Sequence, residues 1–140
     1  MPSMTEEQRN AFLAEPRYGV LTLLREDGSP IGVPIWFEWT GEAVRMFTNV
    51  NSPKMARLAS DPRASLLVAN GVDEAEAWIA FDGAISVREE GGLALAEKLA
   101  DRYWDLSNPD HAGVLEFWRQ NGDALRLLEL APDRIRSYRF

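Results

Sequence analysis

The sequence contains no cysteine and only one histidine among its 140 residues. Without cysteine the chain has no disulfide, no thiolate zinc site and no cysteine nucleophile. A single histidine, His111, is too few for an ordinary metal cluster and argues against a Ser–His–Asp triad. We therefore expect no metal site.

Long apolar runs and an excess of positive charge are also missing. No stretch approaches the roughly eighteen apolar residues of a membrane span, and the polar N-terminus lacks the apolar centre of a secretory signal. The chain carries 15 basic and 22 acidic residues, a net charge of −7. This charge disfavours broad capture of nucleic acid or of an anionic membrane. We expect one cytoplasmic domain over residues 1–140 that binds neither.

Short β-rich runs separated by turn signals dominate the chain. Asp27-Gly28 between two apolar runs predicts a hairpin, Pro34 predicts an edge strand or bulge, and Asp82-Gly83 predicts a bulge. Helices are expected near 5–14 and 52–60. Two more are expected between residues 93 and 121, and strands at 19–24, 31–39, 43–49, 63–70, 78–88, 124–130 and 135–140. Strands joined by tight turns, with helices inserted, favour an antiparallel barrel or sandwich.

The segment from Thr48 to Arg57 carries the strongest chemical signal. Ser52 is a good helix N-cap, and Pro53 suits the first helical position. Lys54 then opposes the helix dipole at a cost of up to about 1 kcal/mol, which a bound anion would reverse. Residues 43–63 hold four basic side chains against one acid, or +3. Ser52, Lys54 and Arg57 could converge on a phosphate; the alternative is a capped surface helix whose cations point into water.

Tryptophan is the second clue, because the chain has five. Trp36 and Phe37 fall on opposite faces of an expected strand, so one of them faces away from the core. A planar cofactor could stack there. The alternative is a tryptophan of the core or of a dimer interface.

Three fragments, GVLTLLREDGSPIGVPIWFEW, MFTNVNSPKMARLASDPRASLLV and WIAFDGAISV, cover most of the first ninety residues. In this order they resemble the pyridoxamine 5′-phosphate oxidase-like family of flavin- and deazaflavin-binding split β-barrels. The resemblance implies a mainly β fold with inserted helices, a six-stranded antiparallel Greek-key barrel. It also implies a homodimer with two cofactor sites at the interface. By resemblance the phosphate is held by Ser52 and Lys54, helped by Thr48 and Arg57, and the ring is lined by Pro34, Ile35, Trp36 and Asn49.

The chain departs from the family members that make pyridoxal phosphate. Residues 31–39 contain no basic side chain, and the C-terminal end RIRSYRF lacks the family's Arg-x-His element. We therefore expect not a vitamin B6 phosphate but a small organic substrate, which exchanges hydride with FMN. The cofactor ring carries this chemistry, so no catalytic residue is named.

Three alternatives to the FMN oxidoreductase stay open besides a purely structural dimer with an empty cleft. The first is an F420-dependent reductase of the same fold. The second is a non-catalytic module that stores or senses flavin. The third is a haem-binding module, for which His111 is the only histidine ligand available.

Overall fold

Seven antiparallel strands form one curled sheet in the computed structural model, which describes residues 2–140. The strand order is β2-β1-β5-β6-β7-β4-β3. The strands are β1 (Gly19–Leu24), β2 (Pro30–Ile35), β3 (Glu38–Trp39), β4 (Val44–Asn49), β5 (Arg63–Ala69), β6 (Ala77–Arg88) and β7 (Leu125–Arg139). The helices are α1 (Glu6–Ala14), α2 (Pro53–Ser60), α3 (Gly92–Tyr103), α4 (Pro109–Gln120) and the short 3-10 helix η1 (Gly122–Ala124).

The expected mainly β, antiparallel split barrel is confirmed, with seven strands in place of six. The expected strand at 31–39 is divided into β2 and β3, and Trp36 and the fully buried Phe37 lie between them. The expected strands at 124–130 and 135–140 are one continuous strand, β7. A register shift between Asp82 and Gly83 lets β7 pass Pro132, which has no backbone N–H, without leaving β6.

Several local predictions are also confirmed. The register of β6 against β7 shifts at Asp82-Gly83, where a bulge was expected, although the extra residue is Asp133 of β7. Pro34 lies in β2, an edge strand of the sheet. Thr5 caps α1 in a capping box with Gln8. Ser52 caps α2, and Pro53 occupies its first turn.

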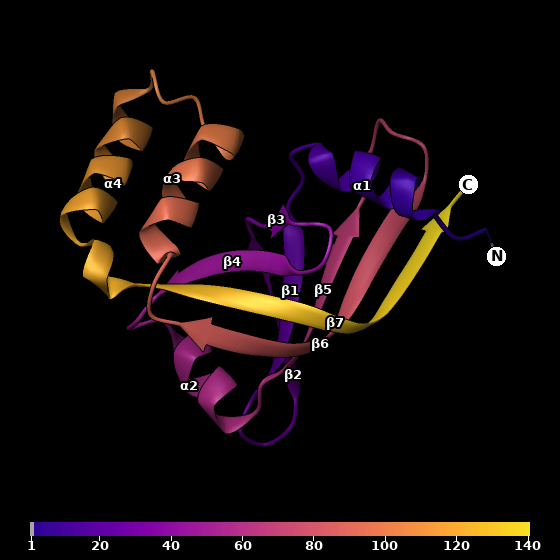
Figure 1. Cartoon of the computed structure of the whole chain (residues 1–140), viewed down its shortest axis with the longest axis horizontal. Coiled ribbons are helices and arrows are strands. Elements are labelled where there is room, and N and C mark those ends of the chain that lie inside the picture. Colours follow the sequence, from indigo (N-terminus) through magenta and orange to yellow (C-terminus); the bar gives the residue numbers. More distant parts are fainter. Residues whose placement is uncertain (1) are drawn as a thin grey trace.

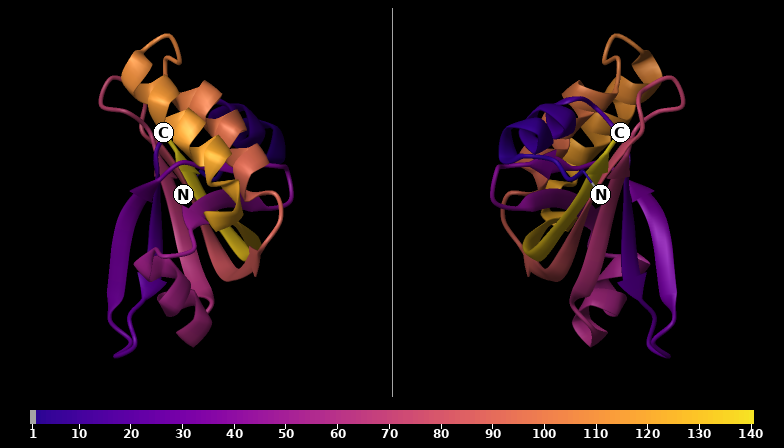
Figure 2. Two further views of the ribbon diagram at one scale, coloured as in Figure 1. Left: turned by 90° about the vertical axis from the view of Figure 1, so that its left-hand side faces the viewer. Right: turned by 90° about the vertical axis from the view of Figure 1, so that its right-hand side faces the viewer.

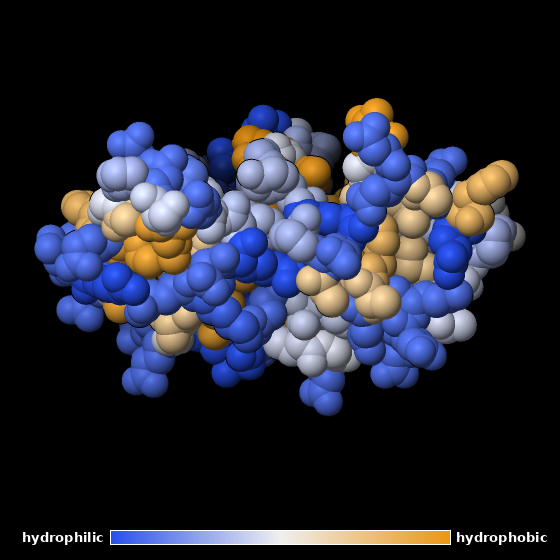
Figure 3. Space-filling model, turned by 90° about the horizontal axis from the view of Figure 1, so that it is seen from above, coloured by the Kyte–Doolittle hydropathy of each residue, from blue (hydrophilic) through white to orange (hydrophobic). Residues whose placement is uncertain are grey.

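The core fills the inside of the curled sheet, and a smaller cluster lies outside it. Phe37, Phe81 and Met46 are among the fully buried side chains of the inner core. On the outer face, Leu95 and Leu99 of α3 pack around Leu127 of β7. Figure 1 shows α3 and α4 as a pair beside β4, and Figure 2 places α2 with the tip of the β1–β2 hairpin at the opposite end. Viewed from above, the surface is largely hydrophilic, with apolar side chains in separate patches (Figure 3).

Helix α3 is also hydrogen-bonded to the N-terminal segment. The guanidinium of Arg102 donates to the carbonyl oxygens of Leu13, Ala14 and Glu15, at 2.9, 3.0 and 2.8 Å. The hydroxyl of Tyr103 donates to the carbonyl oxygen of Arg17 at 2.7 Å. These bonds fix α1 and the α1–β1 connection against α3.

The two ends of the described chain lie side by side (Figure 1). The backbone N–H of Arg139 donates to the carbonyl oxygen of Pro2 at 3.1 Å, and that of Met4 donates to Ser137 Oγ at 2.9 Å. Among residues 2–140, no helix has both the length and the apolar character needed to cross a membrane.

Candidate functional site

The turn between β4 and α2 is braced by its own side chains. Ser52 Oγ accepts from the backbone N–H of Lys54 at 3.2 Å, and Asn49 Oδ1 accepts from the backbone N–H of Asn51 at 2.8 Å. The backbone N–H of Ser52 donates to the carbonyl oxygen of Asn49 at 2.9 Å. Because a hydroxyl is both donor and acceptor, the Ser52 O–H can still donate outward, as can the amide –NH₂ of Asn49.

Two cations stand at this turn without a counter-ion. Lys54 and Arg57 are both half-buried, and neither forms an ion pair with another residue in the part of the chain that the structure describes. Partial burial lowers the pKa of Lys54, and the nearby charge of Arg57 lowers it further. A negatively charged group such as a phosphate, bound beside Lys54, would stabilise the protonated ammonium group and oppose both effects.

The structure separates Thr48 from the other residues of the predicted phosphate site. Thr48 lies on the inner face of β4 with Val44 and Met46 and is 6% exposed. Phe47 and Asn49 lie on the outer face of the same strand. Thr48 therefore supports the strand beneath the site and does not open onto its outer surface.

A hollow of about 320 Å³ lies where β2 ends, between β4 and the α3–α4 pair. It is lined by Tyr18, Pro34, Ile35, Trp36, Phe47, Trp104 and Trp118. The three residues that the resemblance assigns to a cofactor ring beside β2 are thus brought together here. Phe47 and Asn49 are two residues apart on one face of β4, about 7 Å along the strand. The hollow and the β4–α2 turn therefore adjoin each other.

Four of the lining residues were not among those predicted for this site: Tyr18, Phe47, Trp104 and Trp118. Phe47 packs edge-on against Trp118, with ring centroids 5.2 Å apart. The helical pattern of residues 109–120 places Trp118 on an apolar stripe but does not say which strand that stripe faces. The residues of the hollow come together only through the packing of α3 and α4 on β4.

His111 belongs to the same aromatic cluster. Its ring stacks on Trp104 with centroids 4.5 Å apart and planes 8° apart. Its Nδ1 atom is buried and has no hydrogen-bond partner within residues 2–140. Only Nε2 is therefore left as a possible ligand atom. In the described chain no three His, Asp or Glu side chains gather as a metal site.

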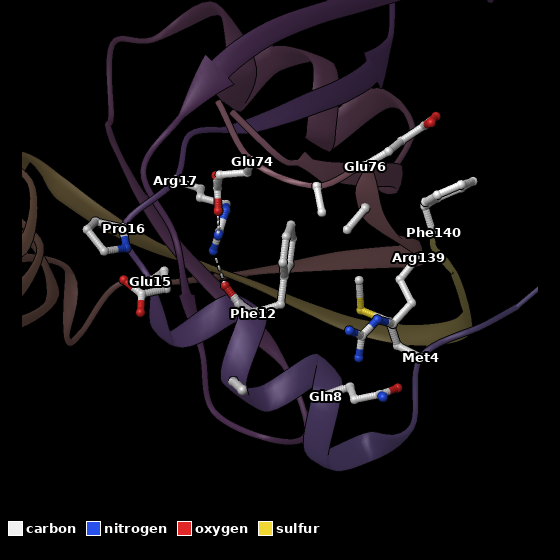
Figure 4. Close-up of a pocket in the computed structure, with 13 residues that line it drawn as sticks. Met4, Gln8, Phe12, Glu15, Pro16, Arg17, Glu74, Glu76, Arg139 and Phe140 are labelled. Atoms are coloured by element: carbon white, nitrogen blue, oxygen red, sulfur yellow. Dashed lines mark hydrogen bonds and ion pairs between the residues drawn. The ribbon is translucent and has the colours of Figure 1, made fainter. Parts of the chain in front are cut away.

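A larger hollow of about 640 Å³ separates α1 from the β5–β6 loop and the C-terminal end of β7 (Figure 4). None of the residues predicted from the sequence lines it. Arg17 lies over the ring of Phe12 at 3.9 Å and is bonded to Glu74 and to the carbonyl oxygen of Phe12. The terminal nitrogens of Arg17 thus join α1 to the β5–β6 loop, although its buried Nε has no hydrogen-bond partner within residues 2–140. We assign this hollow no ligand.

A family model described as pyridoxamine 5′-phosphate oxidase matches residues 5–139 of the chain. Among solved structures, an F420 reductase is 23% identical, with a TM-score of 0.73 over 96% of this chain and 98% of that one. A conserved hypothetical protein of Mycobacterium tuberculosis is 24% identical, with a TM-score of 0.74 over 97% and 85%. The FAD and heme binding protein of Mycobacterium smegmatis is 21% identical, with a TM-score of 0.72 over 98% and 72%. At these identities the likeness establishes a shared fold. No curated protein matches the chain.

Proposed function

The chain belongs to the pyridoxamine 5′-phosphate oxidase family, as the order of its sequence fragments predicts, and from this premise we propose that it is a flavin-dependent oxidoreductase that binds FMN. The observation that carries the proposal is the pair of half-buried cations, Lys54 and Arg57, without a counter-ion beside the Ser52 hydroxyl. In this proposal Ser52, Lys54 and Arg57 hold the phosphate, and Thr48 stiffens β4 beneath them.

The ring of the cofactor would lie along β2, near Pro34, Ile35 and Trp36, with the amide of Asn49 at its edge. β2 pairs with β1 only, so its other edge carries backbone N–H and C=O groups that are free to bond to ring heteroatoms. When bound, the ring supplies hydride transfer to or from a small organic substrate. The protein would anchor the phosphate and orient the ring along the edge of β2. The aromatic side chains around the hollow would exclude water from the ring.

A second copy of the chain would complete this site. The outer face of β1 and β5 exposes Tyr18, Val20 and Leu67, at 64%, 42% and 40%. Val20 pairs with Leu67 on one side and with Pro34 on the other, so this apolar strip runs to the β2 edge. Contiguous exposed apolar surface of this kind is typical of an interaction site. We expect a dimer in sedimentation; a monomer that binds FMN with full affinity would overturn the interface site.

The cofactor alternatives come from the similar structures. One is an F420 reductase and another is an FAD and heme binding protein. Flavin, deazaflavin and haem give different absorbance spectra, so the spectrum of the purified protein separates them. Bound flavin without turnover of any reductant would favour a storage or sensing role. A haem spectrum would direct attention to His111 Nε2.

The Lys54→Ala variant tests the phosphate site. We expect weaker FMN binding by about 1.5–3 kcal/mol, or roughly 10- to 150-fold, through loss of a charge-assisted contact. The titration follows the quenching of flavin fluorescence. The chain has one other lysine, Lys98 of α3, which forms an ion pair with Glu38 of β3. Lys98→Ala is therefore the matched control. Equal affinity of Lys54→Ala and wild type would remove the proposed site.

A further inference from the structure

We propose that the aromatic hollow between β2, β4 and the α3–α4 pair binds a flat, uncharged aromatic molecule about the size of naphthalene, and that this molecule is the substrate. Its role as substrate rests on the proposed function, whereas its binding does not. The volume of about 320 Å³ lies near the lower end of small-molecule sites, about 300–1,000 Å³.

One side of the hollow is formed by Tyr18 and Trp36, which both stack on Tyr103, a residue outside the lining. Tyr18 and Tyr103 have centroids 5.9 Å apart and planes 26° apart. Tyr103 and Trp36 are 5.1 Å apart with planes only 4° apart. Because the Tyr103 hydroxyl is bonded to the backbone of Arg17, the stack is fixed in place.

The second wall is another stack, carried by the helix pair. His111 and Trp104 are 4.5 Å apart with planes 8° apart, and Trp104 and Trp118 are 5.6 Å apart with planes 16° apart. The two stacks meet at Trp36 and Trp104, whose planes cross at 85° with centroids 4.6 Å apart. A planar guest in this corner meets ring faces on one wall and ring edges on the other, both favourable aromatic geometries.

The rings where the two stacks meet are left partly open. Trp36, Trp104 and Trp118 are each half-buried, although the cores on both sides of the sheet are closed by fully buried side chains. Aromatic side chains contribute most when they are covered, so a guest would bury the apolar surface that this corner leaves exposed.

The charge of the lining selects the guest. None of the lining residues carries a charged side chain; their polar groups are the indole N–H groups and the Tyr18 hydroxyl. An indole N–H can only donate, so a carbonyl or similar acceptor on the guest suits this lining. An ionised guest would lose hydration here without meeting a counter-charge. The cations Lys54 and Arg57 lie at the other end of the site, where the phosphate is proposed.

A competition experiment on the wild-type protein tests this selectivity. The neutral, polarity-sensitive dye 6-propionyl-2-(dimethylamino)naphthalene is bound first and then displaced by 2-acetylnaphthalene or by 2-naphthoate, which are close in shape and differ in charge. We expect 2-acetylnaphthalene to displace the dye at a concentration at least about tenfold lower. Equal displacement by the two competitors, or no dye binding, overturns the proposal.

Two variants of neighbouring residues on α4 locate the site. Trp118→Leu removes one ring of the lining and should weaken dye binding about tenfold. Phe117→Leu changes a side chain that is 60% exposed and does not line the hollow, and should leave dye binding unchanged. Equal weakening by both variants contradicts the assignment. Circular dichroism establishes that each variant is folded, and the wild-type competition decides the matter if Trp118→Leu is not.

FMN titrations in parallel separate this inference from the proposed function. If dye and FMN bind together, the hollow accepts a second planar molecule beside the cofactor, as proposed. If one equivalent of FMN expels the dye, the hollow is the seat of the cofactor ring and the substrate assignment is wrong. If FMN does not bind while the neutral competitor keeps its advantage, the proposed function fails and the aromatic site stands.

Discussion

Arg102 offers a direct test of how the N-terminal helix is attached to the rest of the protein. Its guanidinium extends from α3 to the C-terminal end of α1 and donates to three carbonyl oxygens, at 2.8–3.0 Å. The last turn of α1 contains no basic residue of its own. Arg102 and Arg17, which donates to the carbonyl oxygen of Phe12, are therefore the two cations at the negative end of the α1 dipole. The perturbation is Arg102→Met, which keeps most of the aliphatic stem and removes the charge and the donors.

The expected cost follows from the exposure of the three bonds. Only the bond to Leu13 is partly buried, so it counts as one charge-assisted hydrogen bond of about 1.5–3 kcal/mol. The bonds to Ala14 and Glu15 are exposed, and water replaces much of what they contribute. The dipole interaction adds about 0.3–1 kcal/mol. We therefore expect Arg102→Met to lower the free energy of unfolding by about 2–4 kcal/mol, and Tm by about 7–14 °C.

Urea unfolding followed by tryptophan fluorescence measures this loss, and hydrogen exchange locates it in the amides of α1. The control is Arg119→Met on α4, where the ion pairs with Glu97 and Glu116 are exposed. Such pairs contribute below about 1 kcal/mol. A loss no larger in Arg102→Met than in this control would refute the reasoning.

Three further predictions concern the sheet and the phosphate site. Gly83→Ala should destabilise the fold by about 1–3 kcal/mol in urea unfolding, because its new Cβ would lie 2.5 Å from the carbonyl oxygen of Ala131. The control is Gly113→Ala, whose new Cβ has no neighbouring atom within 4 Å. The affinity of the wild-type protein for FMN should fall as pH rises, beginning below the ordinary lysine pKa of 10.5, because the pKa of Lys54 is lowered. The Lys54→Arg variant should keep its affinity over the same pH range. Equal pH profiles of wild type and Lys54→Arg would contradict this prediction. The hydrogen bond from Arg136 lowers the pKa of Asp82 below its ordinary value of 3.8. This carboxylate therefore stabilises the fold fully above pH 3.8, and its contribution is lost as pH falls below 3.8 through the lowered pKa of the folded state. Acid unfolding of Asp82→Asn should show a shallower pH dependence, by less than about 1 kcal/mol.

The parts of the fold that could be predicted from sequence depend on neighbours in the chain. Ser52-Pro53 begins a helix because a hydroxyl and a fixed φ suit the first turn, whatever surrounds them. The register shift at Asp82-Gly83 has an equally local cause, whereas the break between β2 and β3 was not predicted. The cluster of Ser52, Lys54 and Arg57 could be predicted for the same reason, since one helical turn brings these residues together.

The rest of the site depends on contacts that no local pattern encodes. Trp36, Trp104 and Trp118 come from an edge strand and two helices, and they meet only because α3 packs on the outer face of β4 and β7. The pattern of α4 shows an apolar stripe without its target. The expected break before Ile135 was wrong because β7 keeps its pairing with β6 on both sides of Asp133, through a register shift that leaves this one residue of β7 unpaired.

The position of β7 between β6 and β4 has a consequence for how the protein is made. β4 is synthesised early, yet its central partner arrives about eighty residues later, when Thr48 meets Arg126. Until β7 is synthesised, the nascent chain contains two separate pieces of sheet, β2-β1-β5-β6 and β3-β4. The edges of β6 and β4 that β7 will join are still unpaired. Contacts of such long sequence separation slow folding, and open edges invite pairing with other chains. The nascent chain should therefore be most prone to aggregation just before β7 emerges, and β7 then joins the two pieces of sheet in one step.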